Sequence, residues 1–320
     1  MQRYAISECE SGCGNKNLEK RFDKPEWDNK NAFHPFIHII FSIMGFTLTV
    51  IGCGSATPVG HRLSSAFVLK KENSCFLIDC GEASQLHLKD NHIRMQRIEH
   101  IFISHLHGDH YFGLVGLLSS MHLFGRRAPL HLYGPPALET IVNMQLEAGC
   151  TELLYPLHFH PTQDREFALL YEDRTISVYS FPLDHGMPTT GFLFKENVPE
   201  RVVPAQYLSD VLAAARPKSL PKSFAYCSDT AYNEDIIPYI KGVDLLYHEA
   251  TFLESEVDLA KSRFHTTARQ AAQLARKAEV KKLLVGHYSA RYAGTHEFVV
   301  EASEYFSPVL PATEGLVLEI

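Results

Sequence analysis

The sequence predicts an α/β fold in which mixed β-sheets are covered by helices. From Phe46 onward, short apolar strand-like runs alternate with longer helical segments over nearly the whole chain. This alternation is typical of sheets packed against helices. The chain has 320 residues, of which 45% are hydrophobic and 21% charged. It is therefore long enough for a sizeable core, and its composition is that of a globular protein.

The first half is predicted to contain more strands than helices. Strands are expected at residues 46–51, 65–69, 75–79, 100–103 and 130–133. Helices are expected near residues 82–90, 111–124 and 136–148. The strands are short apolar runs, whereas the helical segments are longer and mix polar with apolar residues.

The second half repeats this arrangement. Strands are expected at residues 176–181, 191–194, 224–227, 245–247, 283–285 and 316–320. Helices are expected near residues 254–262, 267–279 and 296–305. Thr267 and Gln270 have the spacing of a capping box, which marks the start of one of these helices.

Two segments differ from the rest. Residues 1–43 begin with a polar stretch that has no helical or strand period, and we expect them to be a dispensable or disordered extension of a domain at 44–320. Residues 195–223 carry four prolines and mixed charge, and are predicted to leave the core. No charge occurs between Asn31 and Gly60, but Pro35 and several glycines interrupt that stretch, so no stable membrane association is expected.

Charge and cysteine content limit the function classes. A net charge of −7 excludes a uniformly positive surface, so any nucleic acid would have to be bound by a local patch. The seven cysteines are odd in number and show no framework spacing, which favours reduced thiols and a cytoplasmic location. The 18 histidines are more informative, because imidazole is both a common zinc ligand and a proton shuttle.

Four potential metal ligands directly follow the predicted strand at 100–103. They are His105, His107, Asp109 and His110. An extended stretch presents the first two to the same side, and the glycine before Asp109 allows a turn toward a neighbouring position. This geometry favours two adjacent metal sites. A purely structural role for all four side chains is disfavoured, because burying so many polar groups without a ligand has a high free-energy cost.

The run His-Leu-His-Gly-Asp-His resembles the signature of the metallo-β-lactamase superfamily. The resemblance covers Phe46 to Ile320 and implies an αββα sandwich, in which two mixed β-sheets are flanked by helices and metals lie at one edge. It also implies further ligands at His185, Asp229 and His287, each of which follows an apolar strand.

The same resemblance implies two Zn²⁺ ions per subunit, although Mn²⁺ or Fe²⁺ would also suit such ligands. One ion would be held by His105, His107, His185 and Asp229. The other would be held by Asp109, His110, Asp229 and His287, with Asp229 as the bridging carboxylate. Asp79 is predicted either to orient a ligand histidine or to serve only as a turn residue.

Within this superfamily, five segments resemble ribonuclease Z in particular. They are Gly52-Cys-Gly-Ser-Ala-Thr-Pro followed by Arg62, Asp79-Cys-Gly-Glu82, His248-Glu-Ala-Thr-Phe, Phe264-His-Thr-Thr-Ala and His287-Tyr-Ser-Ala-Arg-Tyr292. The resemblance implies a zinc-dependent endoribonuclease that removes the 3′ trailer of precursor tRNA by attack of a metal-activated water. The tRNA would keep a 3′ hydroxyl and the trailer a 5′ phosphate. It also implies a homodimer.

Roles for individual residues follow from this chemistry. Asp109 is predicted to accept a proton from the water, and His248 to donate one to the leaving 3′ oxygen, unless it only bonds to backbone. His265 is predicted either to seat a phosphate or to serve at the helix entry. Arg291 is predicted to contact phosphate or to form a surface ion pair, and Arg62 is a weaker candidate of the same kind.

The chain departs from this family in one segment. Bacterial ribonuclease Z has a protruding arm between the third and fourth ligand motifs, whereas His185 and Asp229 here are only 44 positions apart (229 − 185). We therefore expect a shortened arm at 195–223, weaker capture of tRNA and a shallower salt dependence. The alternative function is a phosphodiesterase or small-ester hydrolase of the same fold that does not act on tRNA. A non-catalytic binding module fits less well, because every expected ligand is present.

Overall fold

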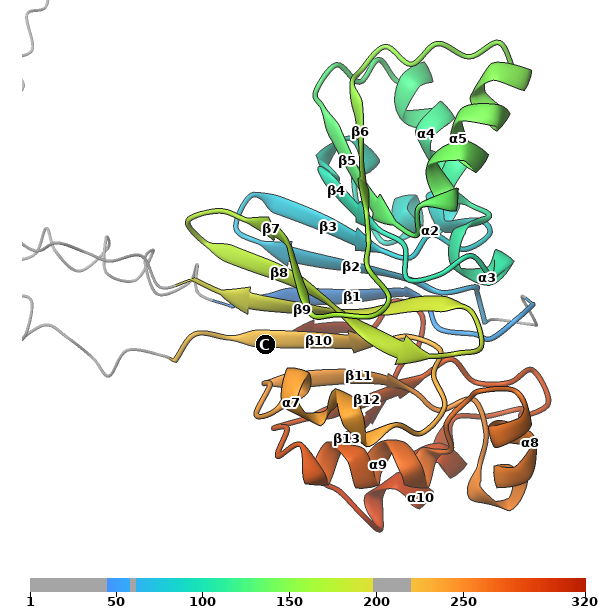
Figure 1. The fold of residues 1–320 in the computed structure, drawn as a ribbon, viewed down its shortest axis with the longest axis vertical. Helices are drawn as coiled ribbons and strands as arrows, with labels where there is room; N and C mark the ends of the chain where they lie inside the picture. The colour runs from blue at the N-terminus through green and yellow to red at the C-terminus, as the bar shows by residue number, and fades with distance from the viewer. Residues whose placement is uncertain (1–44, 58–61, 198–219) are drawn as a thin grey trace, which may run out of the picture. The chain divides into compact units, whose positions relative to one another are not determined.

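The computed structural model describes residues 45–57, 62–197 and 220–320. These residues form two seven-stranded sheets that pack face to face, with helices on the outer sides (Figure 1). The predicted αββα sandwich is therefore confirmed. Helices α4 (Leu114–Leu123) and α5 (Ala137–Ala148) cover the first sheet, and α9 (Ala268–Lys277) and α10 (His296–Ser303) cover the second.

The first sheet has the strand order β14-β1-β2-β3-β4-β5-β6. Its strands are β1 (Thr47–Gly52), β2 (Ala66–Lys71), β3 (Ser74–Ile78), β4 (His100–Phe102), β5 (Leu130–Gly134), β6 (Leu157–Pro161) and β14 (Val317–Glu319). Strands β3, β4, β5 and β6 run parallel, whereas β14, β1, β2 and β3 are joined by antiparallel pairs.

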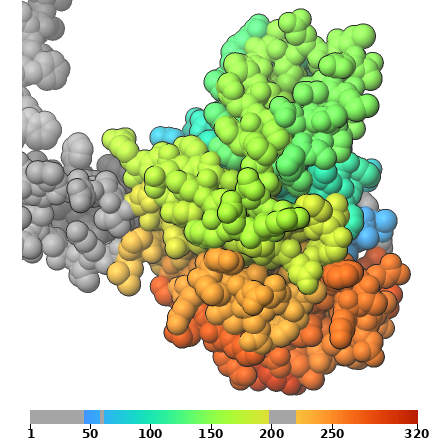
Figure 2. Space-filling model, viewed as in Figure 1, coloured from blue at the N-terminus to red at the C-terminus, as the bar shows by residue number. Residues whose placement is uncertain are grey.

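The second sheet has the order β13-β12-β11-β10-β9-β8-β7. Its strands are β7 (Ala168–Glu172), β8 (Ile176–Asp184), β9 (Pro188–Glu196), β10 (Ser223–Cys227), β11 (Leu245–Glu249), β12 (Leu283–Gly286) and β13 (Val309–Pro311). Strands β10 to β13 run parallel. In Figure 2 the surface formed by β8 and β9 lies in the middle, with the helices α4 and α5 above it and the C-terminal helices below it.

Short helices complete the described part of the chain. They are α2 (Ser84–Asp90), α3 (Gly108–Tyr111), α7 (Ile237–Ile240) and α8 (Val257–Ser262), with 3₁₀ turns η1 (Met95–Arg97), η3 (Glu234–Ile236) and η4 (Glu254–Glu256). The capping box at the start of α9 is confirmed, because the side chains of Thr267 and Gln270 each accept a hydrogen bond from the other residue's backbone N–H.

The sequence did not predict three edge strands, β6, β7 and β13. Strand β6 (Leu-His-Phe-His-Pro) alternates apolar residues with histidines, and β7 (Ala-Leu-Leu-Tyr-Glu) has only a short apolar run. Both strands expose or half-expose all their residues. The helix predicted at 111–124 is also divided into α3 and α4. Gly113 lies at this break, where an added Cβ would stand 2.1 Å from the carbonyl oxygen of Gly81. The close approach of these two backbones therefore requires glycine.

Two hydrophobic clusters hold the layers together. The larger lies between the sheets and continues beneath α9, whose buried alanines let the helix approach the second sheet closely. Within it, Phe67 of β2 contacts Tyr226 of β10 and Tyr247 of β11, with ring centroids 5.3 and 4.5 Å apart. The second cluster lies between the first sheet and helices α2, α4 and α5.

The parallel strands end together at one edge of the sandwich. Residues that follow β3, β4, β10 and β12 therefore meet there, as expected for the carboxyl ends of parallel strands. These residues include Asp79, the stretch 104–110, Asp229 and His287. The topology thus brings together motifs that are far apart in the sequence.

Two predicted segments fall largely outside the described residues. This applies to residues 1–43 and, within the predicted arm, to residues 198–219, so these predictions remain untested. Lys195 and Glu196, at the start of the predicted arm, belong to β9. Among the described helices, none combines the length and apolar character needed to cross a membrane.

Candidate metal centre

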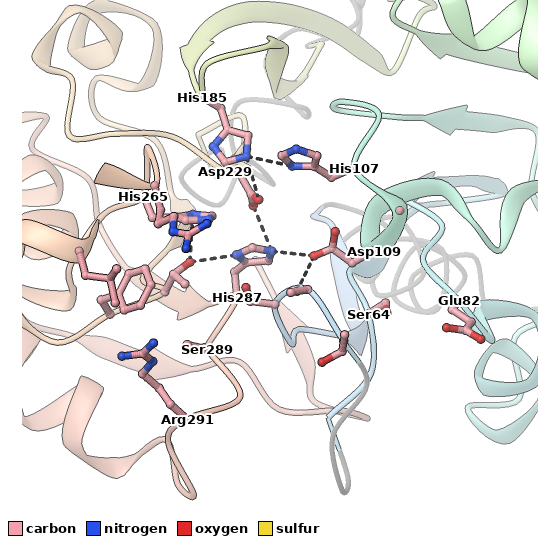
Figure 3. Close-up of a pocket in the computed structure, with 18 of the residues that line it drawn as sticks. Ser64, Glu82, His107, Asp109, His185, Asp229, His265, His287, Ser289 and Arg291 are labelled. Atoms are coloured by element: carbon pink, nitrogen blue, oxygen red, sulfur yellow. Dashed lines mark hydrogen bonds and ion pairs between the residues drawn. The ribbon is translucent and has the colours of Figure 1, made fainter. Parts of the chain in front are cut away.

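All seven side chains predicted as metal ligands line one site at the carboxyl edge of the two sheets. They form two groups that could each hold a metal ion and that share Asp229. Figure 3 labels five of them, His107, Asp109, His185, Asp229 and His287. Five of the seven are buried to at least nine-tenths, and they come from four separate stretches of the chain. The site therefore combines a high density of nitrogen and oxygen ligands with little exposure to water.

The first group contains His105, His107, His185 and Asp229. His107 Nδ1 lies 3.1 Å from both His105 Nε2 and His185 Nε2. The Oδ2 atom of Asp229 lies 3.6 Å from His105 Nε2 and 3.5 Å from His185 Nε2. Three imidazole nitrogens and one carboxylate oxygen thus converge on one point, as a tetrahedral zinc site requires.

The second group contains Asp109, His110 and His287, again with Asp229. His110 Nε2 and His287 Nε2 are 3.2 Å apart. Asp109 Oδ2 lies 3.6 Å from the former and 3.4 Å from the latter. The Oδ1 atom of Asp229 lies 3.4 Å from His110 Nε2 and 3.1 Å from His287 Nε2.

Asp229 therefore faces both groups, one with each carboxylate oxygen. Its side chain is buried, and Oδ1 has no hydrogen-bond partner among the described residues. A buried carboxylate oxygen without a donor is costly, whereas a cation at this position would satisfy it. The donor set and this unpaired oxygen fit a pair of divalent metal ions.

The outer nitrogens of four of these rings are held by neighbouring groups. The Nδ1 atoms of His105, His110, His185 and His287 lie 3.0, 2.8, 2.9 and 3.0 Å from Ser104 Oγ, Asp79 Oδ2, the Phe264 carbonyl oxygen and Thr251 Oγ1. A ring whose Nδ1 carries the proton presents an unprotonated Nε2 to the site. Such bonds orient histidines as metal ligands.

Asp79 holds the centre of this outer shell. Its carboxylate accepts hydrogen bonds from the Ser104 backbone N–H at 2.8 Å, from the Tyr226 hydroxyl at 2.7 Å and from His110 Nδ1 at 2.8 Å. The prediction that Asp79 orients a histidine of the motif is confirmed. Asp79 also connects the two sheets, because it follows β3 of the first sheet and bonds to Tyr226 in β10 of the second.

Electrostatics divide the histidines into two kinds. Burial lowers the pKa of His105 well below its usual value, which keeps its ring neutral. Burial also disfavours a charge on His110, but the carboxylates of Asp229, Asp109 and Asp79 override it and raise the His110 pKa. This charge-rich environment would equally favour a divalent cation.

Asp109 lines the cavity next to the second group. Its Oδ2 accepts a hydrogen bond from the Ala56 backbone N–H at 2.7 Å. Burial raises the pKa of this carboxyl, but His110 and His287 outweigh it, and the net shift is downward. The carboxylate form therefore prevails, and it can act as a ligand or a proton acceptor.

The structure does not bring His248 to the site. Side chains alternate along a strand. In β11, Tyr247 and Glu249 face the space between the sheets and the site, so His248 points to the opposite face, where α9 packs. His248 is buried, its Nδ1 hydrogen-bonds to the Glu249 carbonyl at 2.7 Å, and it is not among the residues that line the cavity. This placement argues against the predicted proton-donor role.

His265, in contrast to His248, does reach the site. It lines the cavity, and its Nδ1 lies 2.8 Å from Glu249 Oε1. Burial opposes a charge on this ring, but the Glu249 carboxylate overrides burial and raises the His265 pKa to about 9. His265 also forms a third possible metal group with Asp229 and His287.

The importance of Glu249 was missed from the sequence. This buried carboxylate accepts hydrogen bonds from the backbone N–H groups of Thr230, Thr251 and Thr266 as well as from His265. The alternation of side chains along the 245–249 strand is the signal that could have identified it, because Glu249 and His248 must face opposite sides.

The predicted arginines occupy different places. Arg291 lines the cavity and forms an ion pair with Glu256. Arg62 does not line it, and donates instead to the Ser289 carbonyl oxygen at 3.3 Å. Arg263 was not predicted, yet it is exposed and lines the cavity, which has a volume of about 720 Å³. A cavity of this size can accept a ligand larger than a single phosphate group.

Comparison with known proteins connects this geometry to a family. Residues 46–198 match the family model described as anti-Pycsar protein Apyc1. The chain is 40% identical over 301 residues to ribonuclease Z of Parabacteroides distasonis, covering 86% of this chain and 99% of that protein. It is 44% identical over 298 residues to ribonuclease Z of Cytophaga hutchinsonii, covering 85% and 95%. The crystal structure of the short form of human tRNase Z superposes with a TM-score of 0.68 and 28% identity, covering 85% and 98%.

Proposed function

Because this chain belongs to the ribonuclease Z family, we propose that it is a metal-dependent endoribonuclease that removes the 3′ trailer of precursor tRNA. The products are a tRNA with a 3′ hydroxyl and a trailer with a 5′ phosphate. The observation that carries this proposal is the position of Asp229, whose two oxygens face two separate histidine groups. Such a bridging carboxylate suits a two-metal phosphodiesterase.

We propose Zn²⁺ as the metal, two ions per chain, because histidine-rich sites with few carboxylates suit zinc. His105, His107, His185 and Asp229 would hold one ion, and Asp109, His110, Asp229 and His287 the other. When bound, such a pair lowers the pKa of water toward neutrality and stabilises charge on the phosphate oxygens.

The chain itself supplies two proton-transfer groups. Asp109 is a carboxylate on the wall of the cavity, and it accepts the proton from the attacking water. His265 also lines the cavity, and donates a proton to the 3′ oxygen that leaves. Figure 3 shows the two residues on opposite sides of His287, an arrangement that suits in-line displacement. General acid catalysis of this kind contributes about 10²–10⁴-fold.

We assign His265 to proton donation in preference to metal binding. Its Nδ1 is bonded to Glu249, which holds the ring in place and favours a proton on the ring. The two roles differ in a measurable way: a His265→Ala variant keeps its bound zinc if His265 is a proton donor, and loses part of it if His265 is a ligand.

The remaining family properties are proposals of the same kind. We propose that the enzyme acts in the cytoplasm as a homodimer and binds precursor tRNA through local basic groups at the cavity. Arg263 and Arg291 are the arginines among the cavity-lining residues of the described chain. Size-exclusion chromatography with light scattering tests the dimer.

Activity assays on two substrates test the proposed function. Zinc-loaded protein should trim a precursor tRNA to a defined 3′ hydroxyl end and should also hydrolyse bis(p-nitrophenyl) phosphate. Asp109→Ala should abolish both activities while circular dichroism shows an unchanged fold. Hydrolysis of the small ester without any trimming of tRNA would replace this proposal with a small-ester phosphodiesterase.

A further inference from the structure

Two large aromatic side chains are exposed beside the metal centre, although neither belongs to it. Phe112 is 67% exposed and Phe264 is 44% exposed. Exposed apolar side chains are common on protein surfaces, so exposure alone does not distinguish these two; their place beside the candidate ligands does. Both rings also rest on a glycine whose neighbour in the sequence is a candidate metal ligand.

Phe112 lies over Gly108, the residue between His107 and Asp109. A Cβ added to Gly108 would stand 2.3 Å from the Phe112 ring, so the ring packs directly on the backbone of the ligand loop. Phe112 also lines the cavity. The ring is therefore held in place on one side, while most of its surface stays accessible.

Phe264 also packs on a glycine, next to His185, although it is not among the residues that line the cavity. A Cβ added to Gly186 would stand 3.2 Å from the Phe264 ring. The Phe264 carbonyl oxygen lies 2.9 Å from His185 Nδ1. Phe264 has φ 55, a left-handed conformation that is unfavourable for a bulky residue. Strain of this kind is concentrated at functional sites, since surrounding contacts must maintain it.

We propose that Phe112 and Phe264 are stacking platforms for the unpaired nucleobases on either side of the cleaved phosphodiester bond. This inference rests on the proposed function. Every nucleobase has an apolar face that can stack on an aromatic ring, so such platforms hold single-stranded RNA without requiring one sequence. Stacking would also compensate for a chain whose net charge of −7 weakens its attraction to phosphate.

The position of His265 assigns each ring to one nucleotide. The leaving 3′ oxygen belongs to the last nucleotide of the tRNA and must lie within reach of His265. Phe264 is the residue before His265, so it stacks on the base of that last tRNA nucleotide. Phe112 lies beside Asp109 and stacks on the base of the first trailer nucleotide.

Precursor tRNAs that lack one base test this assignment. One substrate is abasic at the last tRNA nucleotide, and another at the first trailer nucleotide. Each is cleaved by the zinc-loaded wild type, Phe112→Leu and Phe264→Leu at fixed salt, and kcat/KM is measured. Phe112→Tyr and Phe264→Tyr keep an aromatic ring. Phe167→Leu removes a ring just before β7 that is 40% exposed, and serves as the matched control.

We expect each abasic change to lower wild-type kcat/KM by on the order of 10-fold. Phe264→Leu should lower cleavage of the intact precursor by a similar factor, and lose nothing further on the substrate abasic at the last tRNA nucleotide. Phe112→Leu should behave in the same way with the substrate abasic at the first trailer nucleotide. The tyrosine variants keep a ring that can stack, so with each substrate they should cleave faster than the leucine variants. Phe167→Leu should match the wild type.

Three results would overturn the inference. First, the leucine variants could cleave the intact precursor as fast as the wild type. Second, each leucine substitution could lower kcat/KM by the same factor on both abasic substrates as on the intact precursor. Third, the leucine variants could lose activity only together with bound zinc or melting temperature, which would indicate a structural role. If the wild type does not cleave the intact precursor at all, the proposed function fails first, and this inference fails with it.

Discussion

The Glu249 carboxylate accepts a hydrogen bond from His265 Nδ1 at 2.8 Å, and so holds the ring at the wall of the metal centre. The two residues lie 16 positions apart, on β11 and at the entry to α9. Three backbone N–H groups fix the carboxylate in turn. The position of His265 is therefore determined by the second sheet, and not by its own segment.

The first prediction separates His265 from His248. His265→Ala should lower the rate of precursor cleavage by about 10²–10⁴-fold, because it removes the proposed proton donor. His248→Asn should keep nearly full activity, since the asparagine amide can replace the Nδ1–H that bonds to the Glu249 carbonyl oxygen. The check is single-turnover cleavage with zinc content measured in parallel. A folded His248→Asn protein without activity would contradict the assignment.

Removal of the proposed bridging carboxylate, Asp229, should empty the proposed metal centre. Asp229→Asn should lower bound zinc per chain, measured by elemental analysis after dialysis, and abolish cleavage. The matched control is Asp184→Asn, whose exposed carboxylate lies next to His185 and belongs to neither ligand group. Full zinc content in Asp229→Asn would argue against a bridge.

A chelator should lower the stability of the wild-type fold more than that of Asp229→Asn. Zinc that binds only the folded state adds about 2.7 kcal/mol at a free concentration 100 times its Kd. The wild-type melting temperature should therefore fall when a chelator is added, and the fall should be smaller in Asp229→Asn. An equal fall in both proteins would contradict this prediction.

Two stacked tyrosines should respond oppositely to loss of the hydroxyl group. Tyr226 and Tyr247 have ring centroids 4.9 Å apart and are both fully buried. Tyr226→Phe removes the bond to Asp79 and should lower the free energy of unfolding by about 1–3 kcal/mol. Tyr247→Phe should be neutral or stabilising, because its hydroxyl finds no partner in the described part of the chain. Urea denaturation of both variants provides the comparison.

Acid should destabilise the fold through His100. Burial, and then His131 and His160, lower its pKa to about 3. In the unfolded chain this pKa is about 6.5, so below that pH the unfolded state binds a proton that the folded state excludes. Stability should therefore fall as the pH drops below about 6.5, with His100 contributing ~2–3 kcal/mol by pH 4.5.

A variant can isolate that contribution. His100→Phe keeps a ring of similar size among Phe76, Phe102 and Tyr171, but cannot bind a proton. Its free energy of unfolding should decline less between pH 6.5 and 4.5 than that of the wild type. His296→Gln changes an exposed histidine and should leave the wild-type decline unaltered. Parallel curves for His100→Phe and the wild type would exclude His100 as the cause.

Arg263 should contribute to RNA capture. Arg263→Gln should weaken binding of precursor tRNA and reduce the slope of log K against log salt by ~1, as expected for loss of one phosphate contact. Arg276→Gln, an exposed change at the end of α9, is the control of equal charge. Binding should be measured at several salt concentrations with catalytically inactive protein. An unchanged slope would place Arg263 outside the contact surface.

Much of the fold could be predicted because its signals are local. Buried strands such as β3 and β10 are short apolar runs, and the capping box of α9 is complete within four residues. Strands β6 and β7 carry only weak signals of this kind, a brief alternation of apolar residues with histidines and a short apolar run, and both are exposed or half-exposed at the edges of the sheets. Their pairing partners, and not their own residue pattern, make them strands.

The sequence by itself determined which residues could serve as metal ligands. It set the spacing of His105, His107, Asp109 and His110, and it placed His185, Asp229 and His287 after later strands. Only the tertiary structure decided which side chains meet. His248 and His265 both belong to segments that resemble the family. His248 nevertheless faces α9, whereas His265 faces the candidate metal centre. The physical reason is that sequence sets the alternation along a strand, whereas the packing of two sheets sets which face becomes the site.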